Sequence, residues 1–323
     1  MNKTPDNQLI SAYIPDNITE IRRLTGGHIN HSFLVMGDVP YILQSLNRDL
    51  FEDSLGVLIS NYEIYRENCD IYNKGNGYWE CPVWLKNRNG DYFQRDNEGN
   101  IFRMYRYIPS DEPGKIDTVN KYEIGKGLGK MHRILSKCRD IGNIESIAHL
   151  HDLSFHYNEY LKQNKINTGR IKEIDDRIND TIESMLKITV PSDDIVHADA
   201  GIKNMIVKDG RVAGFIDLDT IMTGSVYDDI ADCARSCCTD EKGQTYVPAL
   251  EDLIKGYEDG SGIGFSADKI SLICENIIKH RFMLGLRYYT DHLSGRGYFN
   301  EEYPGQSLDK ARTLFFSPFM GIM

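Results

Sequence analysis

The amino-acid pattern changes once along this chain, and that change constrains the fold more than any other feature. Before about residue 108, short runs rich in β-branched and aromatic residues alternate with turn residues. After Pro109, apolar residues recur at helical spacing, first in the stripe from Ile124 to Leu135. A chain of 323 residues is long enough for two domains. We therefore predict an α+β fold of two lobes, comprising residues 1–108 and 109–323.

The first lobe is predicted to be an antiparallel sheet with one helix. Its strand-like runs are ITEIRRL, HSFLVM, PYILQSL, PVWLK, DYFQ and IFRMYRYI. Between the third and fourth runs, apolar residues from Leu55 to Tyr65 recur at helical spacing. One helix therefore interrupts the strands and can cover a face of the sheet.

The second lobe is predicted to be mainly helical, with one small β insert. A second helical stripe runs from Ile171 to Met185. The insert consists of NMIVK and RVAGFI, joined by Asp209-Gly210. Asp-Gly favours the positive φ angles of a two-residue hairpin turn, so these runs should pair.

Composition excludes several classes of protein. The formal net charge of −11 argues against a general nucleic-acid binder, which needs clustered Lys and Arg, and it leaves a small-molecule partner. No apolar run is long enough to span a bilayer, and the first residues lack a signal-peptide pattern, so we expect a cytoplasmic protein. The seven cysteines have no metal-ligand spacing and are expected to be reduced, buried thiols.

The segment VHADAGIKNMIV carries the strongest chemical signal. It contains H-x-D-x-x-x-x-N, formed by His197, Asp199 and Asn204, directly before the predicted hairpin. In the catalytic loop of kinases, the Asp accepts the proton of the substrate hydroxyl and the Asn binds Mg²⁺. We therefore predict Asp199 as the catalytic carboxylate and His197 as a catalytic-loop residue that braces the loop through a hydrogen bond.

The hairpin supplies a second metal ligand. Its far strand ends beside Asp217, so a carboxylate returns to the amide of Asn204. Both offer hard oxygen ligands of the kind that Mg²⁺ prefers. Without this context, Asp199 could simply cap a turn and His197 could simply pack in a core.

The chain resembles the aminoglycoside phosphotransferase and choline kinase superfamily, which has a protein-kinase-like fold of two lobes. Within it, the chain is most similar to bacterial N-acetylhexosamine 1-kinases. The segments that carry this resemblance are GGHINHSFLV, YILQSLN, IAHLHD, FIDLDTIMTGS and GLRYYTDHLSGRGYF. The resemblance implies that ATP and Mg²⁺ are used to phosphorylate the anomeric hydroxyl of a sugar.

The resemblance also implies a set of substrate contacts. In the sugar kinases the segment around His28 and Asn30 faces the active cleft, so both are expected to contact the sugar. Thr220, Arg287 and Tyr298 match the sugar-binding positions of the family. The alternatives are that the first two only shape a turn and that Arg287 is a solvated surface group.

Nucleotide contacts are expected in the first lobe. The backbone of Gly26 and Gly27 can approach phosphate closely. Kinases place a Lys on the third strand, paired with a helix Glu, to hold the phosphates. This chain has Gln44 there, with Glu63 on the helix, which leaves no positive charge.

Two further segments complete the interpretation. Arg106 and Tyr107 lie in the run that joins the lobes, which resembles the hinge where backbone groups hydrogen-bond adenine. Asp229 is expected to cap a helix or brace the catalytic loop. His149 and His151 are interpreted as part of a structured loop, because residues at i and i+2 share no helix face and no further ligand set is evident.

Together these features favour an ATP- and Mg²⁺-dependent N-acetylhexosamine 1-kinase. The alternatives are a phosphotransferase for aminoglycosides, choline or another small alcohol, and a catalytically silent nucleotide-binding regulator suggested by Gln44. Sugar and ATP are the expected partners, without nucleic acid or membrane. A monomer is compatible with the sequence, which does not indicate an oligomeric state.

Overall fold

The computed structural model describes the chain apart from residues 1–4, 6, 16, 25–29, 76, 112–118, 140, 142–146, 167–168, 240–244, 300 and 318–323. It has the α+β fold predicted from the sequence, with an antiparallel sheet followed by a mainly helical part. The chain divides into two compact units, and each is described by itself. The first unit is Met1–Ile59 with Cys81–Pro109, and the second is Ser60–Glu80 with Ser110–Met323.

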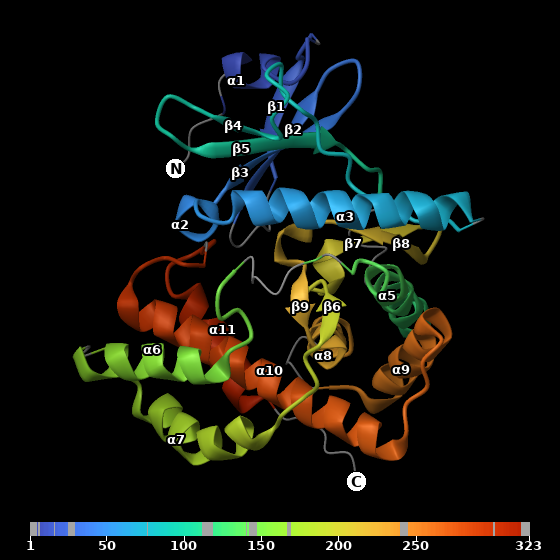
Figure 1. Cartoon of the computed structure of the whole chain (residues 1–323). Helices are drawn as coiled ribbons and strands as arrows, with labels where there is room; N and C mark the ends of the chain where they lie inside the picture. Colours follow the sequence, from blue (N-terminus) through green and yellow to red (C-terminus); the bar gives the residue numbers. More distant parts are fainter. Residues whose placement is uncertain are drawn as a thin grey trace. The chain divides into compact units, whose positions relative to one another are not determined.

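A five-stranded antiparallel sheet forms the first unit, in the order β1-β2-β3-β5-β4. Its elements are α1 (Asn7–Ser11), β1 (Glu20–Arg23), β2 (His31–Met36), β3 (Tyr41–Leu46), α2 (Arg48–Phe51), β4 (Phe93–Arg95) and β5 (Ile101–Arg106). Leu43 pairs with Phe33 on one side and Met104 on the other, and all three are buried. They form one core with residues of α1, which lies against the sheet in Figure 1.

One strand prediction in this unit is wrong. The run PVWLK forms no strand, and only Trp84 makes an isolated bridge, to Tyr105. Its indole instead stacks on the buried guanidinium of Arg103, whose Cζ lies 4.5 Å from the ring centroid. The apolar run therefore packs by its side chains, while its backbone stays largely outside the sheet.

Most of α3 (Leu55–Lys74) belongs to the second unit, which is built from helices and two small sheets. Its other elements are α5 (Lys121–Leu135), α6 (Leu153–Ile166), α7 (Lys172–Lys187), β6 (Asp194–Val196), η1 (Ile202–Asn204), β7 (Met205–Lys208), β8 (Arg211–Phe215), η2 (Leu218–Thr220), β9 (Met222–Gly224), α8 (Val226–Cys237), α9 (Val247–Ser261), α10 (Ala267–Ser294) and α11 (Gln306–Phe316). The long helix α10 packs against α6, α7 and α11 in a shared apolar core (Figure 1).

Helices α5 and α9 pack at unusually short range because glycines of each helix lie against the backbone of the other. A Cβ on Gly125 would lie 1.9 Å from the carbonyl oxygen of Leu253, and a Cβ on Gly256 would lie 1.9 Å from that of Tyr122. Any side chain at these two positions would push the helices apart. The pair positions Tyr257, whose hydroxyl hydrogen-bonds His132 of α5.

The predicted hairpin is confirmed. Strands β7 and β8 pair antiparallel around Asp209 and Gly210, whose φ angles are 51° and 69°. Strands β6 and β9 form a separate two-stranded sheet beside it. These two sheets carry the segment that contains the candidate site.

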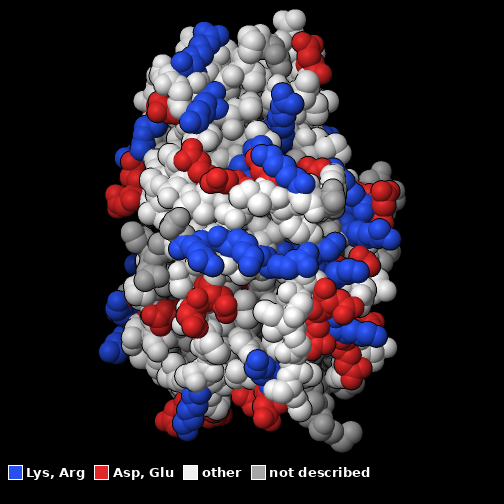
Figure 2. Space-filling model, turned by 45° about the vertical axis from the view of Figure 1, so that its right-hand side comes forward, with Lys and Arg blue, Asp and Glu red and all other residues white. Residues whose placement is uncertain are grey.

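Both signs of charge are present on the face drawn in Figure 2. All seven cysteines are free thiols; six are buried and Cys81 is partly buried. No helix among the described residues is both long and apolar enough to cross a membrane.

Candidate functional site

The segment between β6 and β7 is a short loop with one strained residue. It runs from His197 to Asn204, and its backbone adopts φ = +63° at Ala198. A non-glycine residue in this left-handed region costs on the order of 1–2 kcal/mol, so other contacts must hold it there. The strain lies directly before Asp199.

Asp229 supplies those contacts from the first turn of α8. One carboxylate oxygen accepts a hydrogen bond from the backbone N–H of His197 and the other from that of Ala198, each at 2.8 Å. Asp229 is fully buried, so its two oxygens fix the loop with little freedom. Asp229 therefore braces this loop, as expected from the sequence, while the catalytic role of the loop stays a prediction.

A second layer holds Asp229 itself. His132 of α5 donates from Nε2 to Asp229 at 2.8 Å and accepts at Nδ1 from the hydroxyl of Tyr257, also at 2.8 Å. Burial, and then the charge of Asp229, raise the pKa of Tyr257, which keeps this hydroxyl protonated as a donor. Helices α5, α8 and α9 thus all contribute to the position of the loop.

The imidazole of His197 lies within the loop and is fully buried. Its Nε2 donates to the carbonyl oxygen of Ile216 at 3.0 Å, and its Nδ1 accepts from the backbone N–H of Asp199 at 3.3 Å. Both ring nitrogens are therefore engaged with backbone groups. This geometry suits a brace between the loop and the end of β8 better than a base.

Asp199 and Asn204 form the polar centre of the loop. The amide Nδ2 of Asn204 donates to the backbone oxygen and to Oδ2 of Asp199, both at 2.8 Å. This fixes the amide orientation and leaves its Oδ1 to serve as a ligand atom. The side chain of Asp199 is 31% exposed, so an acceptor can reach it.

Asp217 follows β8 in the left-handed conformation, with φ = +59° and ψ = +54°. The backbone N–H of Ile216 donates to the carbonyl oxygen of Asn204 at 2.8 Å, which joins the segments that carry the two predicted metal ligands. An amide oxygen and a carboxylate are a donor set that fits Mg²⁺, which takes few protein ligands. The residues present therefore fit the expected metal.

Lys203 is a charged neighbour that the sequence analysis missed. Its Nζ lies 3.4 Å from Oδ2 of Asp199. Burial lowers the pKa of Lys203, but the neighbouring carboxylates, Asp199 first, outweigh burial and raise it. Its position four residues after Asp199, inside the motif, was a usable signal for this contact.

The three predicted sugar contacts of the second unit fall in two places. Thr220 is buried, and its hydroxyl donates to the carbonyl oxygen of His197 at 2.6 Å, so only its oxygen lone pairs remain for another partner. Arg287 and Tyr298 meet each other: Nη2 of the guanidinium donates to the phenol oxygen at 3.1 Å. The structure thus brings two of the three together.

The predicted nucleotide and sugar residues of the first unit are only partly described. Gly26, Gly27 and His28 lie outside the described residues. Asn30 is buried, and its Oδ1 accepts from the backbone N–H of Asn47 at 3.0 Å. Arg106 and Tyr107 are exposed, and the backbone N–H of Tyr107 donates to Pro40 at 3.1 Å.

Gln44 has a charged partner that the sequence did not indicate. Its Oε1 accepts two hydrogen bonds from the guanidinium of Arg103, at 2.9 and 2.5 Å, across the β3–β5 pair. A positive charge therefore stands beside Gln44, although Arg103 is only 2% exposed. Glu63 is exposed on α3, and its role as partner of Gln44 stays a prediction.

The structure gives His151 neighbours that the sequence did not indicate. Its neighbour His149 pairs with Asp152 in a local turn, as expected for a structured loop. His151, however, lies with Asp228 of α8 and His280 of α10 in a group able to hold a metal ion. The ligand set comes from distant segments and not from one helix face.

Comparison with known proteins places this arrangement in a family. The profile described as "Phosphotransferase enzyme family" matches residues 20–263, more than half of the chain. The chain belongs to this phosphotransferase family. An aminoglycoside 3'-phosphotransferase of Enterococcus faecalis is 41% identical over 71 residues, which span 21% of this chain and 27% of that relative. The match therefore covers about a quarter of the relative's length.

Solved structures of other members of the superfamily share the fold. An amicoumacin kinase in complex with AMP-PNP, Ca²⁺ and Ami superposes with a TM-score of 0.62 at 15% identity, covering 96% of this chain and 92% of that one. A choline/ethanolamine kinase family protein from Mesorhizobium loti gives 0.59 at 14% identity, covering 93% and 89%. This phosphotransferase therefore has the protein-kinase-like fold expected from its sequence.

Proposed function

We propose that this phosphotransferase moves the γ-phosphate of ATP to the anomeric hydroxyl of an N-acetylhexosamine or a related hexose. The observation that carries the proposal is the placement of Asp199, partly exposed and oriented by Asn204 and Lys203. An oriented carboxylate beside a magnesium ligand set is what phosphoryl transfer to a hydroxyl needs. Membership of the phosphotransferase family supports the reaction class.

Asp199 acts as the base in this proposal. It orients the acceptor hydroxyl and takes its proton, while His197 holds the loop in place. Asn204 and Asp217 would hold Mg²⁺, whose chemistry is to neutralise charge on the β- and γ-phosphate oxygens. An anomeric hydroxyl is more acidic than an ordinary alcohol, so a carboxylate is a sufficient base.

Lys203 is a positioning residue of the same site. Its ammonium group, 3.4 Å from Asp199, offsets part of the negative charge of the carboxylates. It also presents positive charge where a transferring phosphoryl group approaches Asp199. We propose that it compensates in part for the absent third-strand Lys.

The acceptor contacts are proposed from the sugar-kinase resemblance. Arg287 and Tyr298 hydrogen-bond each other, and the remaining guanidinium donors can hold sugar hydroxyls or the acetamido oxygen. Thr220, His28 and Asn30 keep their proposed roles toward the sugar. Gly26, Gly27, Gln44, Glu63, Arg106 and Tyr107 keep theirs toward ATP. We propose a cytoplasmic location, without nucleic acid or membrane partners.

A second candidate is an aminoglycoside phosphotransferase, favoured by the 41% identity over 71 residues to the Enterococcus faecalis protein. Both candidates share the base and the metal ligands and differ only in the acceptor. The product separates them: a sugar 1-phosphate carries its phosphate on the anomeric carbon, whereas the second candidate gives a phosphorylated aminoglycoside.

The base assignment is tested by Asp199→Asn. We expect turnover to fall by about 10²- to 10⁴-fold, with nucleotide binding nearly unchanged, because the loss is confined to the transition state. The matched control is Asp209→Asn, at the exposed hairpin turn where Asn tolerates the same positive φ. Near-normal turnover by Asp199→Asn, or an equal loss in the control, contradicts the assignment.

A further inference from the structure

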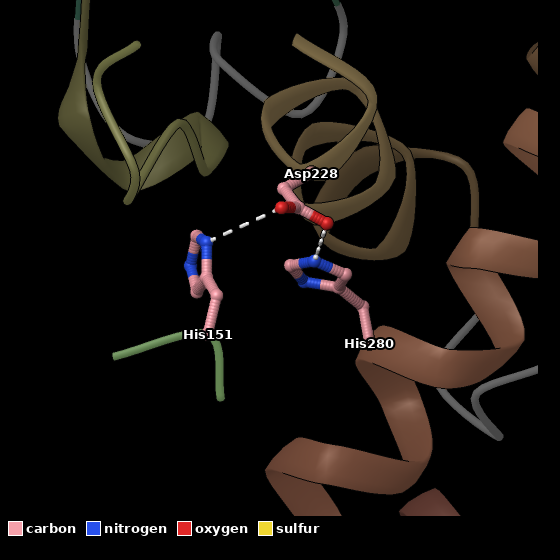
Figure 3. Close-up of side chains that lie close together, drawn as sticks. All are labelled: His151, Asp228 and His280. Carbon is pink, nitrogen blue, oxygen red and sulfur yellow. Dashed lines mark hydrogen bonds and ion pairs between the residues drawn. The ribbon is translucent and has the colours of Figure 1, made fainter. Parts of the chain in front are cut away.

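Two histidines and one aspartate lie close together beside the first turn of α8. His151 comes from the turn before α6, Asp228 from the first turn of α8, and His280 from the middle of α10. Figure 3 shows the two imidazoles on either side of the carboxylate. One ligand atom from each residue lies within 4.8 Å of the other two.

The three side chains lie close together, but hydrogen bonds do not join all of them. His280 Nε2 lies 2.9 Å from Oδ1 of Asp228, which is a hydrogen bond. His151 Nδ1 lies 3.8 Å from Oδ2 of the same carboxylate, which is too long for one. The side chains are 20%, 13% and 5% exposed for His151, Asp228 and His280, so bulk water reaches the group poorly.

A fourth polar side chain adjoins the group from α10. Nδ2 of Asn276 donates to Oδ1 of Asp228 at 3.0 Å. Its own Oδ1 is buried and accepts no hydrogen bond among the described residues, and the whole residue is 0% exposed. A buried acceptor without a donor is unfavourable, and a bound cation would satisfy it.

We propose that His151, Asp228 and His280 bind one divalent transition-metal ion of the Zn²⁺ class. Two imidazole nitrogens and a carboxylate oxygen are ligands that Zn²⁺ takes readily. The fourth position is filled by water or by Oδ1 of Asn276. The ion joins the turn before α6 to α8 and α10, and therefore has a structural role.

The distances are close to those of a zinc site. Ligand atoms 2.0–2.1 Å from a tetrahedral ion lie about 3.3 Å from each other. The 2.9 Å contact of His280 must open slightly, and the 3.8 Å contact of His151 must close slightly. Side-chain rotations suffice for both changes, because the three residues sit on separate segments.

This site differs in chemistry from the predicted magnesium site. Mg²⁺ prefers oxygen ligands and keeps several waters, as Asn204 and Asp217 allow. Imidazole selects Zn²⁺, Cu²⁺, Ni²⁺ or Fe²⁺ over Mg²⁺. Saturating Mg²⁺ should therefore leave the histidine site open to Zn²⁺, and the proposal does not depend on the identity of the acceptor.

The test is a Zn²⁺ titration of the metal-free full chain in excess Mg²⁺, with a chromogenic chelator as competitor. We expect one tightly bound Zn²⁺ per chain and a higher midpoint of thermal unfolding. Substituting Co²⁺ should give visible d–d bands without the charge-transfer band of a thiolate. That spectrum excludes binding by the seven cysteines.

The variant His151→Gln isolates the proposed ligand. It leaves the hydrogen bonds among Asp228, His280 and Asn276 in place, so the fold should survive. Its matched control is His149→Gln, two residues away and 49% exposed in the same turn. We expect Zn²⁺ affinity to fall about 100-fold or more in His151→Gln and to stay normal in the control, because a direct ligand contributes more than an outer-shell partner.

Three results would overturn the proposal: no Zn²⁺ bound by the wild-type chain, equal affinity in wild type and His151→Gln, or a cobalt spectrum with thiolate bands. If His151→Gln fails to fold, X-ray absorption of the zinc-loaded wild type decides. Two imidazoles and oxygen ligands support the site, and sulfur ligands refute it.

Discussion

Adjacent aspartates at the start of α8 have opposite surroundings. Asp229 faces inward, accepts three hydrogen bonds from the catalytic loop and His132, and is fully buried. Asp228 faces two histidines: it accepts a hydrogen bond from His280, and Nδ1 of His151 lies 3.8 Å from its Oδ2. One helical turn thus carries an aspartate that holds the loop and a second aspartate that belongs to the proposed metal-binding group. The difference shows that neighbours in sequence can serve independent purposes when a helix places them on different faces.

Among the residues that support the loop, the largest effect is expected from Asp229→Asn. The amide turns a donor toward backbone N–H groups that need an acceptor, which should destabilise the fold by about 1–3 kcal/mol. The strained loop at Ala198 then shifts, and a displacement near 1 Å can cost about 10²-fold in turnover. Steady-state kinetics and chemical denaturation measure both effects.

The matched variant is Asp228→Asn, on the same helical turn. It should reduce turnover far less than Asp229→Asn, because Asp228 makes no hydrogen bond to the catalytic loop among the described residues. Equal losses in the two variants would remove the distinction between the two faces of α8.

A smaller effect is expected from a change in α9, whose Tyr257 hydrogen-bonds His132 and so supports Asp229. In Gly256→Ala the new Cβ would lie 1.9 Å from the carbonyl oxygen of Tyr122, so α5 and α9 must separate. Such overpacking typically costs about 1–3 kcal/mol, and it displaces Tyr257 from His132. Thermal unfolding measures the loss, with Gly56→Ala on α3 as control, since a Cβ there meets nothing within 4 Å. A neutral Gly256→Ala would show that the close approach is not required.

The last effect concerns His156 of α6 and the dependence of stability on pH. Burial, helped by the Arg287 guanidinium, lowers the pKa of His156 to about 4. The unfolded chain takes up this proton near pH 6.5, so stability is full above that pH and is lost as pH falls toward 4. One such group contributes a slope of at most about 1.4 kcal/mol per pH unit.

The variant His156→Gln tests this contribution. Its free energy of unfolding, measured from pH 7 to pH 4, should fall less steeply than that of the wild type. The difference in slope corresponds to the uptake of about one proton on unfolding. His149→Gln serves as the matched histidine replacement. If the pH dependence of the unfolding free energy is unchanged in His156→Gln, another group causes the loss of stability in acid.

The sequence predicted the fold class and the main elements because the spacing of apolar residues and the residues that form turns can both be recognised within short segments. The stripe from Ile124 to Leu135 became α5, and Asp209-Gly210 became the turn between β7 and β8. The hydrogen-bonded cluster of His197, Asp199 and Asn204 was also accessible, because its members lie within one short loop. Their catalytic roles remain predictions.

The parts that could not be predicted depend on long-range pairing. Arg103 meets Gln44 only because β3 and β5 align, and no spacing in the sequence indicates that register. His151 meets Asp228 and His280 only after α8 and α10 pack together. A search for ligands on one helix face misses such a group, since each of its members comes from a different segment.

The most direct test of the account is ADP release with ATP and Mg²⁺ across N-acetylglucosamine, N-acetylgalactosamine, galactose, glucose, choline and kanamycin, with phosphorus NMR of any product. We expect sugar-dependent ADP release and a phosphate on the anomeric carbon. Release with kanamycin or choline alone would contradict the sugar 1-kinase and keep the phosphotransferase. No release with any acceptor, in a chain that still binds ATP, would contradict the role of Asp199 as a working base and favour a silent nucleotide-binding regulator.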